Sequence, residues 1–358
     1  MLHSWRKLKK TTRQDLVTYA MVTVLFILFQ ALSGAGLLSR SLRGQLIPVC
    51  VYIAAAVALN LVVGVSGELS LGHAGFLSIG AFCGAVFFHL FKGVPSEALR
   101  LLLCMCCGGA AAGLAGLLIG IPVLRLRGDY LAIVTLAFGE IIKNLMNCMY
   151  LGYDDAGWHF SFAQSLSMAG GVTVLNGPMG VTGNVKASTF AIGFGLVLFT
   201  LMVTLNLIRS KTGRAIMAIR DNRIAAESIG LPAGRFKMTA FVTSATLTGM
   251  AGALYMMNFA SVAPAKFGFN TSILLLVFVV LGGIGSIRGS IIAAALLTVL
   301  PEQLRALGDY RMLIYAVLLI AMMLLSNSET GKRFAATAIL RARRALGAGR
   351  RREGRQTR

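Results

Sequence analysis

Long apolar runs, separated by short polar segments, make up most of the chain from residue 16 to residue 326. A helix that crosses a bilayer needs about 20 consecutive, mostly apolar residues. Ten runs approach or reach that length: 16–38, 46–65, 70–91, 101–124, 130–149, 187–208, 238–265, 267–287, 289–304 and 312–326. The pattern predicts an all-α polytopic membrane protein with about ten transmembrane helices and with glycine-interrupted segments.

The composition excludes several other classes of protein. Charged residues make up 13% of the 358 residues, whereas a soluble domain carries about 25%. The net charge of +21 would suit a nucleic-acid-binding protein, but the basic residues lie between the apolar runs and at both ends of the chain. Anionic lipid and membrane topology account for that distribution. We therefore expect contact with membrane lipid and none with nucleic acid.

Lysine and arginine also predict the orientation. With ten crossings and an inner N-terminus, 25 of these residues fall inside and 8 outside, as expected when inner loops are the more basic. The basic start runs into the first apolar run without a cleavage signal, so that run is expected to remain a span. We expect a bacterial inner-membrane protein with both termini in the cytoplasm. We expect a basic cytoplasmic N-terminus at 1–15, a transmembrane permease domain at 16–326 and a basic cytoplasmic tail at 327–358. The permease domain contains an outer loop at 150–186 and an inner loop at 209–237.

The inner loop carries signals for two short helices. The first is predicted over 213–220, where apolar residues recur. Asp221 or Asn222 can then cap a second helix over 221–230. A glycine at the end of that helix and a proline two residues later stop it from continuing. The sequence therefore predicts a compact helical projection and not a loose connector.

The second of these helices has features of a docking element. Arg223 and Glu227 are four residues apart and can pair along its face. Ala225 and Ala226 are expected to leave one side smooth, so that another protein can approach closely. The alternative is an amphipathic helix that lies on the membrane, but its apolar face is short. The candidate residues for coupling to a partner are Arg220, Asp221, Asn222, Ala225, Ala226, Glu227 and Gly230.

Glycine-rich segments with polar residues interrupt the apolar runs at 66–75 and 281–289. Interrupted segments of this kind often mark a transport pathway, because they expose polar groups to a cavity. Close helix packing through small residues is an equally good interpretation. The pathway candidates are Ser66, Gly67, Glu68, Ser70, Gly72, His73, Phe76, Gly282, Gly283 and Gly285.

Ionisable residues at membrane depth are costly and are usually paired or functional. Glu140 and Lys143 are three residues apart on one predicted helix, so an intramembrane ion pair is expected. Glu68 and His73 flank the first interruption and can either line a route or anchor the fold. No second histidine or cysteine lies at useful spacing from His73, so no metal site is predicted. The six cysteines lie almost entirely in apolar runs, as packing residues do.

Two other functions fit parts of the sequence. Residues 64–67 spell GVSG, a motif of intramembrane serine proteases, but a serine nucleophile needs a histidine within hydrogen-bond reach. A proton-coupled secondary transporter could use Glu68, His73 or Glu140 and would need no ATPase. The structured inner loop favours an ATPase partner instead. A phosphate-binding GxxxxGK[ST] sequence does not occur, so the chain is not expected to bind ATP itself.

Several segments resemble one family of ATP-driven transporters. The inner-loop segment GRAIMAIRDNRIAAESIG (213–230) is similar to the loop of the LivM-like permeases of branched-chain amino acid ABC importers. NLVVGVSGELSLGHAGF (60–76), RLRGDYLAIVTLAFGE (125–140), LGGIGSIRG (281–289) and PEQLR (301–305) also resemble that family. The resemblance covers about residues 45 to 326. The outer-loop segment NGPMG (176–180) departs from the family's glycine-rich pattern. This departure bears on the identity of the substrate more than on the fold.

The resemblance implies a non-enzymatic permease subunit that imports leucine, isoleucine and valine. Related systems move urea, amides or other amino acids. The partners it implies are a second, LivH-like permease, two cytoplasmic LivG/LivF-like ATPases and a periplasmic amino-acid binding protein. It implies no cofactor in this chain, since ATP and magnesium are held by the ATPases. The helix over 221–230 would transmit ATPase closure to the spans.

Overall fold

The computed structural model describes residues 10–35, 39–126, 128–154, 157–162, 171–182, 186–304, 308 and 310–327. The chain forms two compact units, Met1–Val299 and Leu300–Arg358. Most of the predicted basic N-terminus and all but the first residue of the basic tail lie outside the described residues. Their predicted roles therefore stay predictions.

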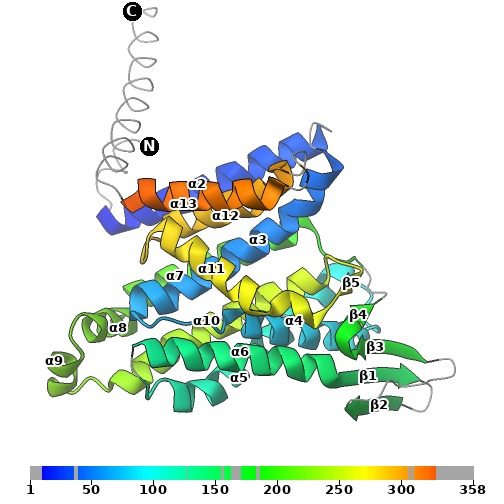
Figure 1. Ribbon diagram of the computed structural model, residues 1–358, viewed down its shortest axis with the longest axis horizontal. Coiled ribbons are helices and arrows are strands. Elements are labelled where there is room, and N and C mark those ends of the chain that lie inside the picture. Colours follow the sequence, from blue (N-terminus) through cyan, green and yellow to red (C-terminus); the bar gives the residue numbers. More distant parts are fainter. Residues whose placement is uncertain are drawn as a thin grey trace, which may run out of the picture. The chain divides into compact units, whose positions relative to one another are not determined.

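Helices occupy the apolar runs of the first unit (Figure 1). They are α2 (Lys10–Gly34), α3 (Arg40–Asn60), α4 (His73–Leu90), α5 (Glu97–Val123), α6 (Asp129–Cys148), α7 (Phe190–Arg209), α10 (Ala233–Met256), α11 (Phe269–Gly282) and α12 (Ile287–Gln303), whose last residues belong to the second unit. The second unit also contains α13 (Arg311–Asn327). Each of the ten predicted runs contains one of these helices, so the protein is mostly helical, as predicted.

Seven helical segments in the described residues are long and apolar enough to cross a membrane. They are Asp15–Gly34, Ser41–Ser66, His73–Leu90, Glu97–Val123, Asp129–Cys148, Phe190–Arg209 and Pro264–Gly282. The other three predicted spans correspond to α10, α12 and α13, and the last two have only 17 residues each. The protein is thus a multi-pass membrane protein, and the count of ten spans stays a prediction.

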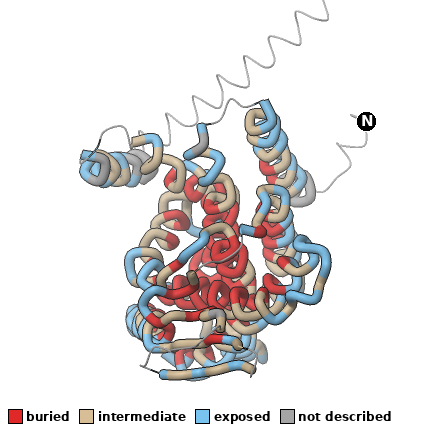
Figure 2. The backbone as a smooth tube through the Cα atoms, turned by 90° about the vertical axis from the view of Figure 1, so that its right-hand side faces the viewer, coloured by how far each residue is buried: buried red, intermediate tan, exposed pale blue. Residues whose placement is uncertain are grey.

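The core lies where α10 packs against α3, α4 and α5. Buried positions, red in Figure 2, gather in the interior of these helices. The contact between α4 and α10 depends on glycine. A Cβ atom added to Gly80 would lie 2.0 Å from the Gly249 carbonyl oxygen, and one on Gly252 would lie 2.0 Å from that of Leu77. Small residues allow two helix backbones to touch, which is a common way of packing helices in lipid.

The prediction of an all-α fold is wrong for the outer loop. Strands β1 (Met149–Asp154), β2 (Gly157–Phe162) and β3 (Val172–Asn176) form an antiparallel sheet in the order β2-β1-β3. Trp158, Phe160 and Phe162 are exposed, while the intervening residues of β2 are half-buried. This alternation with a period of two is typical of a strand, and it is visible in the sequence GWHFSF.

A second correction concerns the run 238–265, which is not one continuous span. Helix α10 ends at Met256, and β5 (Ser261–Val262) then pairs with β4 (Val181–Thr182) from the outer loop. A 3-10 turn, η3 (Pro264–Phe267), leads into α11. Hydropathy did not separate these elements because the turn residues are themselves apolar or small.

Candidate functional site

The inner loop forms two short helices, α8 (Lys211–Asp221) and α9 (Arg223–Ser228). The name coupling segment is used here for residues 210–232. Ser210 begins it as the N-cap of α8, where its Oγ accepts a hydrogen bond from Gly213 N at 3.0 Å. Gly213 must be glycine, because an added Cβ atom would lie 2.2 Å from the Leu207 carbonyl oxygen. Helix α8 is thereby held tightly against the end of α7.

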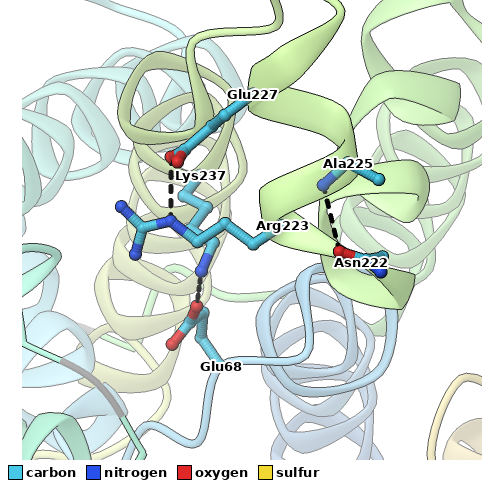
Figure 3. Close-up of polar contacts among 6 residues, drawn as sticks. All are labelled: Glu68, Asn222, Arg223, Ala225, Glu227 and Lys237. Carbon is cyan, nitrogen blue, oxygen red and sulfur yellow. Dashed lines mark hydrogen bonds and ion pairs between the residues drawn. The ribbon is translucent and has the colours of Figure 1, made fainter.

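Helix α9 is capped and closed by the residues that the sequence indicates. Asn222 Oδ1 accepts a hydrogen bond from Ala225 N at 3.0 Å, and Arg223 Nε donates to Glu227 Oε1 at 2.8 Å (Figure 3). Gly230 has a φ of +85°, which ends the helix in the left-handed region. The helix spans 223–228 and is shorter than the predicted 221–230, because Asn222 is its cap and Asp221 belongs to α8.

The two alanines of α9 do not form one smooth outer face. Ala226 is buried against Ile219 and Ala233, so it attaches α9 to the rest of the protein, whereas Ala225 is exposed. The outward apolar side chains are Ile224, 82% exposed, and Ile229, 75% exposed. Sequence reasoning missed both. Burying one isoleucine is worth about 1.5–3 kcal/mol, so this surface is suited to a protein partner.

A surface hollow of about 470 Å³ lies beside α9 and is lined by Glu227, Gly230, Pro232 and Arg235, among others. It joins the end of α9 to the start of α10. The hollow and the exposed isoleucines together form a surface with apolar and charged groups side by side, as in a protein interface.

The first glycine-rich interruption is a true break in the helix. Here the first break means residues 61–72. It begins with a π-helix, η1 (Leu61–Ser66), which ends at Gly67 with a φ of +73°. The chain then remains non-helical until α4 starts at His73. η1 forms the last turns of the segment Ser41–Ser66. π-Helices are rare and are often found at functional sites.

Glu68 anchors the first break to the start of α10. Its carboxylate pairs with the Lys237 ammonium of α10 (Figure 3), and the two side chains are only 12% and 13% exposed. Lys237 was not among the predicted site residues, since nothing in its local sequence marks it. Removing one partner of such a sheltered pair is costly, because the other charge is left uncompensated.

His73 is also an anchor. Its Nε2 lies 2.8 Å from Ser244 Oγ and its Nδ1 lies 3.1 Å from Ser70 Oγ. Ser244 donates its own proton to the Ala58 carbonyl oxygen at 2.5 Å, so we assign the His73 proton to Nε2. His73 therefore ties α4 to α10 and, through Ser244, to α3. The hydroxyl of Ser66 is buried and has no partner among the described residues, so the GVSG motif has no Ser–His pair there.

Other pathway candidates make packing contacts. Phe76 is buried, with its ring centroid 5.5 Å from that of Phe241. Gly72 lies against α6, where an added Cβ atom would be 2.4 Å from the Thr135 carbonyl oxygen. Gly67 is exposed. Whether any of these residues lines a route stays a prediction.

The second break, defined as residues 283–286, meets the first break at Asn60. Asn60 Oδ1 accepts a hydrogen bond from Gly285 N at 2.9 Å, and Asn60 Nδ2 donates to Ser290 Oγ at 2.8 Å. An added Cβ atom on Gly64 would lie 2.4 Å from Gly285 N. The two breaks, more than 200 residues apart in sequence, thus form one junction. Asn60 was quoted in a motif but not chosen as a site residue, because its partner is remote in sequence.

The glycines in the second break and directly before it have separate roles. Gly283 and Gly285 have φ values of +90° and +82°, which other residues rarely adopt. Gly282 instead packs on Gly289, where an added Cβ atom would lie 2.4 Å from the Gly289 carbonyl carbon. The turn between α11 and α12 is therefore narrow.

Replacing Asn60 by leucine is expected to destabilise this junction. The substitution keeps the approximate size but leaves Gly285 N–H and Ser290 Oγ without the partner that they have here. We expect a loss of about 1–3 kcal/mol, measured as a lower thermal unfolding midpoint of the purified protein in detergent. The control is Asn206→Leu on the exposed face of α7. Equal midpoints for the two variants would contradict the assignment of the junction.

The predicted pair of Glu140 and Lys143 forms, and it has a further contact. The two side chains make an ion pair on α6. Glu140 Oε1 also accepts a hydrogen bond from Phe269 N at 2.8 Å, so it caps the start of α11 from a neighbouring helix. A negative charge at a helix N-terminus is favourable. This geometry accounts for both residues as structural anchors.

Comparison with known proteins places this architecture in one family. The family described as "Branched-chain amino acid transport system / permease component" matches residues 42–327. The LivM permeases of Salmonella typhimurium and Escherichia coli are each 38% identical over 289 residues, which is 76% of this chain and 66% of theirs. This chain thus matches just under two thirds of their length.

A more distant relative is named for a different substrate. The fructose import permease FruG of Bifidobacterium longum is 25% identical over 304 residues, covering 80% of this chain and 84% of that protein. No solved structure matches the chain. The family match covers most of the residues, including the coupling segment and both breaks. The chain belongs to the permease components of branched-chain amino acid transport systems.

Proposed function

We propose that the chain is the LivM-type permease subunit of an ATP-driven importer that carries leucine, isoleucine and valine across the bacterial inner membrane. The observation that supports this proposal most is the coupling segment. It is a capped pair of helices with exposed Ile224 and Ile229, in a chain that belongs to this permease family. The 38% identity to two LivM permeases supports the substrate class. Urea, amides or other amino acids are the alternative cargo.

The proposed assembly contains a second, LivH-like permease, two cytoplasmic LivG/LivF-like ATPases and a periplasmic binding protein. Both termini lie in the cytoplasm, on the side of the coupling segment. ATP and magnesium bind to the ATPases, and this chain supplies the passage and the docking surface. Closure of the ATPases moves α8 and α9, and the passage changes from outward- to inward-facing.

A proton-coupled secondary transporter is the second candidate, and the geometry disfavours it. Such a transporter needs an ionisable group that is free to exchange protons with the passage. Glu68 is paired with Lys237, and His73 is held between Ser70 and Ser244. Glu140 is paired and also caps α11. All three are engaged in anchoring contacts.

Reconstitution in liposomes tests the proposal. Radiolabelled leucine uptake is measured with this chain alone, with the full set of partners, and with or without internal ATP. We expect uptake only with the partners and ATP, and no effect of a protonophore. Uptake by the chain alone, driven by a proton gradient, would establish the secondary transporter instead.

A further inference from the structure

Arg220 connects the coupling segment directly to the first break. It lies in the last turn of α8, and its guanidinium Nη1 donates a hydrogen bond to the Gly64 carbonyl oxygen of η1 at 2.8 Å. Its Nε and Nη2 both donate to Asp221 Oδ1, at 3.1 and 2.9 Å. Its aliphatic stem lies next to Gly67, where an added Cβ atom would be 2.6 Å from Arg220 Cγ.

The Gly64 carbonyl needs a donor from outside its own helix. The last carbonyls of a helix have no partner within it. In a continued α-helix Gly64 would accept from the N–H of Glu68, but that N–H donates to the Val62 carbonyl oxygen at 3.1 Å. The turn at Gly67, whose own N–H also donates to Val62, ends the helix there. Arg220 therefore acts as a cap for η1 supplied by another element.

The capped helix end is in turn connected to the second break. Gly64 lies against Gly285, and Asn60 at the start of η1 holds Gly285 and Ser290. On the other side, Ile216 of α8 packs in one cluster with Leu61 and Val65 of η1. A displacement of α8 thus reaches both breaks through η1. It is transmitted by the apolar packing of Ile216 along the side of η1 and by the hydrogen bond from Arg220 to the end of η1.

We propose that Arg220 is the positioning residue that transmits movement of the coupling segment to the π-helix and thereby to the joined breaks. This rests on the proposed function. Asp221 fixes two nitrogens of the guanidinium fork, so the third is aimed at Gly64. Lysine cannot make this arrangement, since it lacks the planar fork. The Glu68–Lys237 pair holds the same break to α10, four residues after Gly64. The first break is therefore tied to both α8 and α10, so a movement of α8 acts on η1.

The test compares Arg220→Gln with Arg214→Gln in the fully assembled, reconstituted transporter. Arg214 is exposed on the same helix, and its replacement by glutamine removes the same charge as Arg220→Gln does. Three quantities are measured: co-purification of the ATPases, leucine imported per ATP hydrolysed, and hydrogen–deuterium exchange of residues 61–68 with and without ATP. Arg220→Lys is carried in parallel as a milder variant that keeps the charge.

For the wild type and Arg214→Gln we expect ATP to change exchange in residues 61–68. For Arg220→Gln we expect assembly and ATP hydrolysis to persist, the ATP-dependent change in exchange to disappear, and import per ATP to fall about tenfold, within the range of coupling between linked sites. For Arg220→Lys we expect import per ATP between that of the wild type and that of Arg220→Gln. If Arg220→Gln does not assemble with the ATPases, Arg220→Lys is the variant compared with Arg214→Gln. The inference would be overturned if Arg220→Gln imported as much leucine per ATP as Arg214→Gln does. It would also be overturned if ATP changed exchange of residues 61–68 in Arg220→Gln as it does in the wild type. Failure of the proposed function would appear separately, as a wild type without ATPase-dependent uptake.

Discussion

Replacing Gly230 by proline is expected to abolish ATP-driven uptake while the chain still inserts into the membrane. Gly230 has a φ of +85°, which proline cannot adopt, and its N–H donates to the Glu227 carbonyl oxygen at 3.0 Å. A misplaced proline costs ~3 kcal/mol or more. Helix α9 has only six residues, so this loss should unfold it. Uptake of labelled leucine and ATPase stimulation measure the effect in reconstituted vesicles.

A matched substitution nearby separates this local effect from a general one. Gly234 lies in the first turn of α10, where proline is tolerated, and no atom of another element lies within 4 Å of an added Cβ atom there. Gly234→Pro should retain most of the uptake. Glu227→Lys, which places two like charges four residues apart, should also uncouple uptake from hydrolysis. Normal uptake by both Gly230→Pro and Glu227→Lys would refute the coupling role of α9.

Replacing Gly252 by valine is expected to prevent the chain from folding. Its Cβ atom would lie 2.0 Å from the Leu77 carbonyl oxygen, and a backbone atom cannot move aside as a side chain can. Helices α4 and α10 would have to separate at the centre of the core. Overpacking of a core costs about 1–3 kcal/mol and occasionally more. We expect the larger cost here and little folded protein after detergent extraction, measured by size-exclusion chromatography.

The control for this prediction is Gly195→Val on the exposed side of α7. Gly195 is also in the interior of a helix, but no neighbouring atom lies within 4 Å of an added Cβ atom. The two variants therefore share any intrinsic effect of valine on a helix. Equal yields of folded protein from both would mean that the contact between α4 and α10 does not limit folding.

Local signals in the sequence predicted the coupling segment well. Asn222 as an N-cap, the Arg223–Glu227 pair and the stop at Gly230 each depend on residues within four positions of one another. Such features follow from helix geometry alone. The positions of the helices in the apolar runs were predictable for the same reason, because hydropathy is a property of each segment by itself.

Features that depend on distant partners were not predictable. Asn60 contacts residues 225 and 230 positions away, and Lys237 pairs with a residue 169 positions away. Their own neighbourhoods contain nothing that specifies these contacts. The exposure of Ile224 was not predictable for the same reason. An isoleucine on a short helix is expected to face inward, and only the fold shows that Ala226 is the buried residue of α9.

The outer sheet was missed for a different reason. The alternation in β2 is present in the sequence, but the outer loop has no strong helical period and no secondary structure was predicted for it. Its three strands are short and stand beside much longer apolar runs, so they contribute little to the hydropathy pattern of the chain. A period of two over six residues is the signal that would have found β2.

The central claim is that the coupling segment lies in the cytoplasm and contacts an ATPase. The most direct measurement places a photo-reactive amino acid at position 224, the most exposed apolar position of the segment, in cells that contain the whole transporter. The account predicts a covalent adduct with the ATPase subunit, whose yield changes when ATP binding is locked. An adduct with the periplasmic binding protein, or labelling of position 224 by a reagent that cannot cross the membrane, would contradict it.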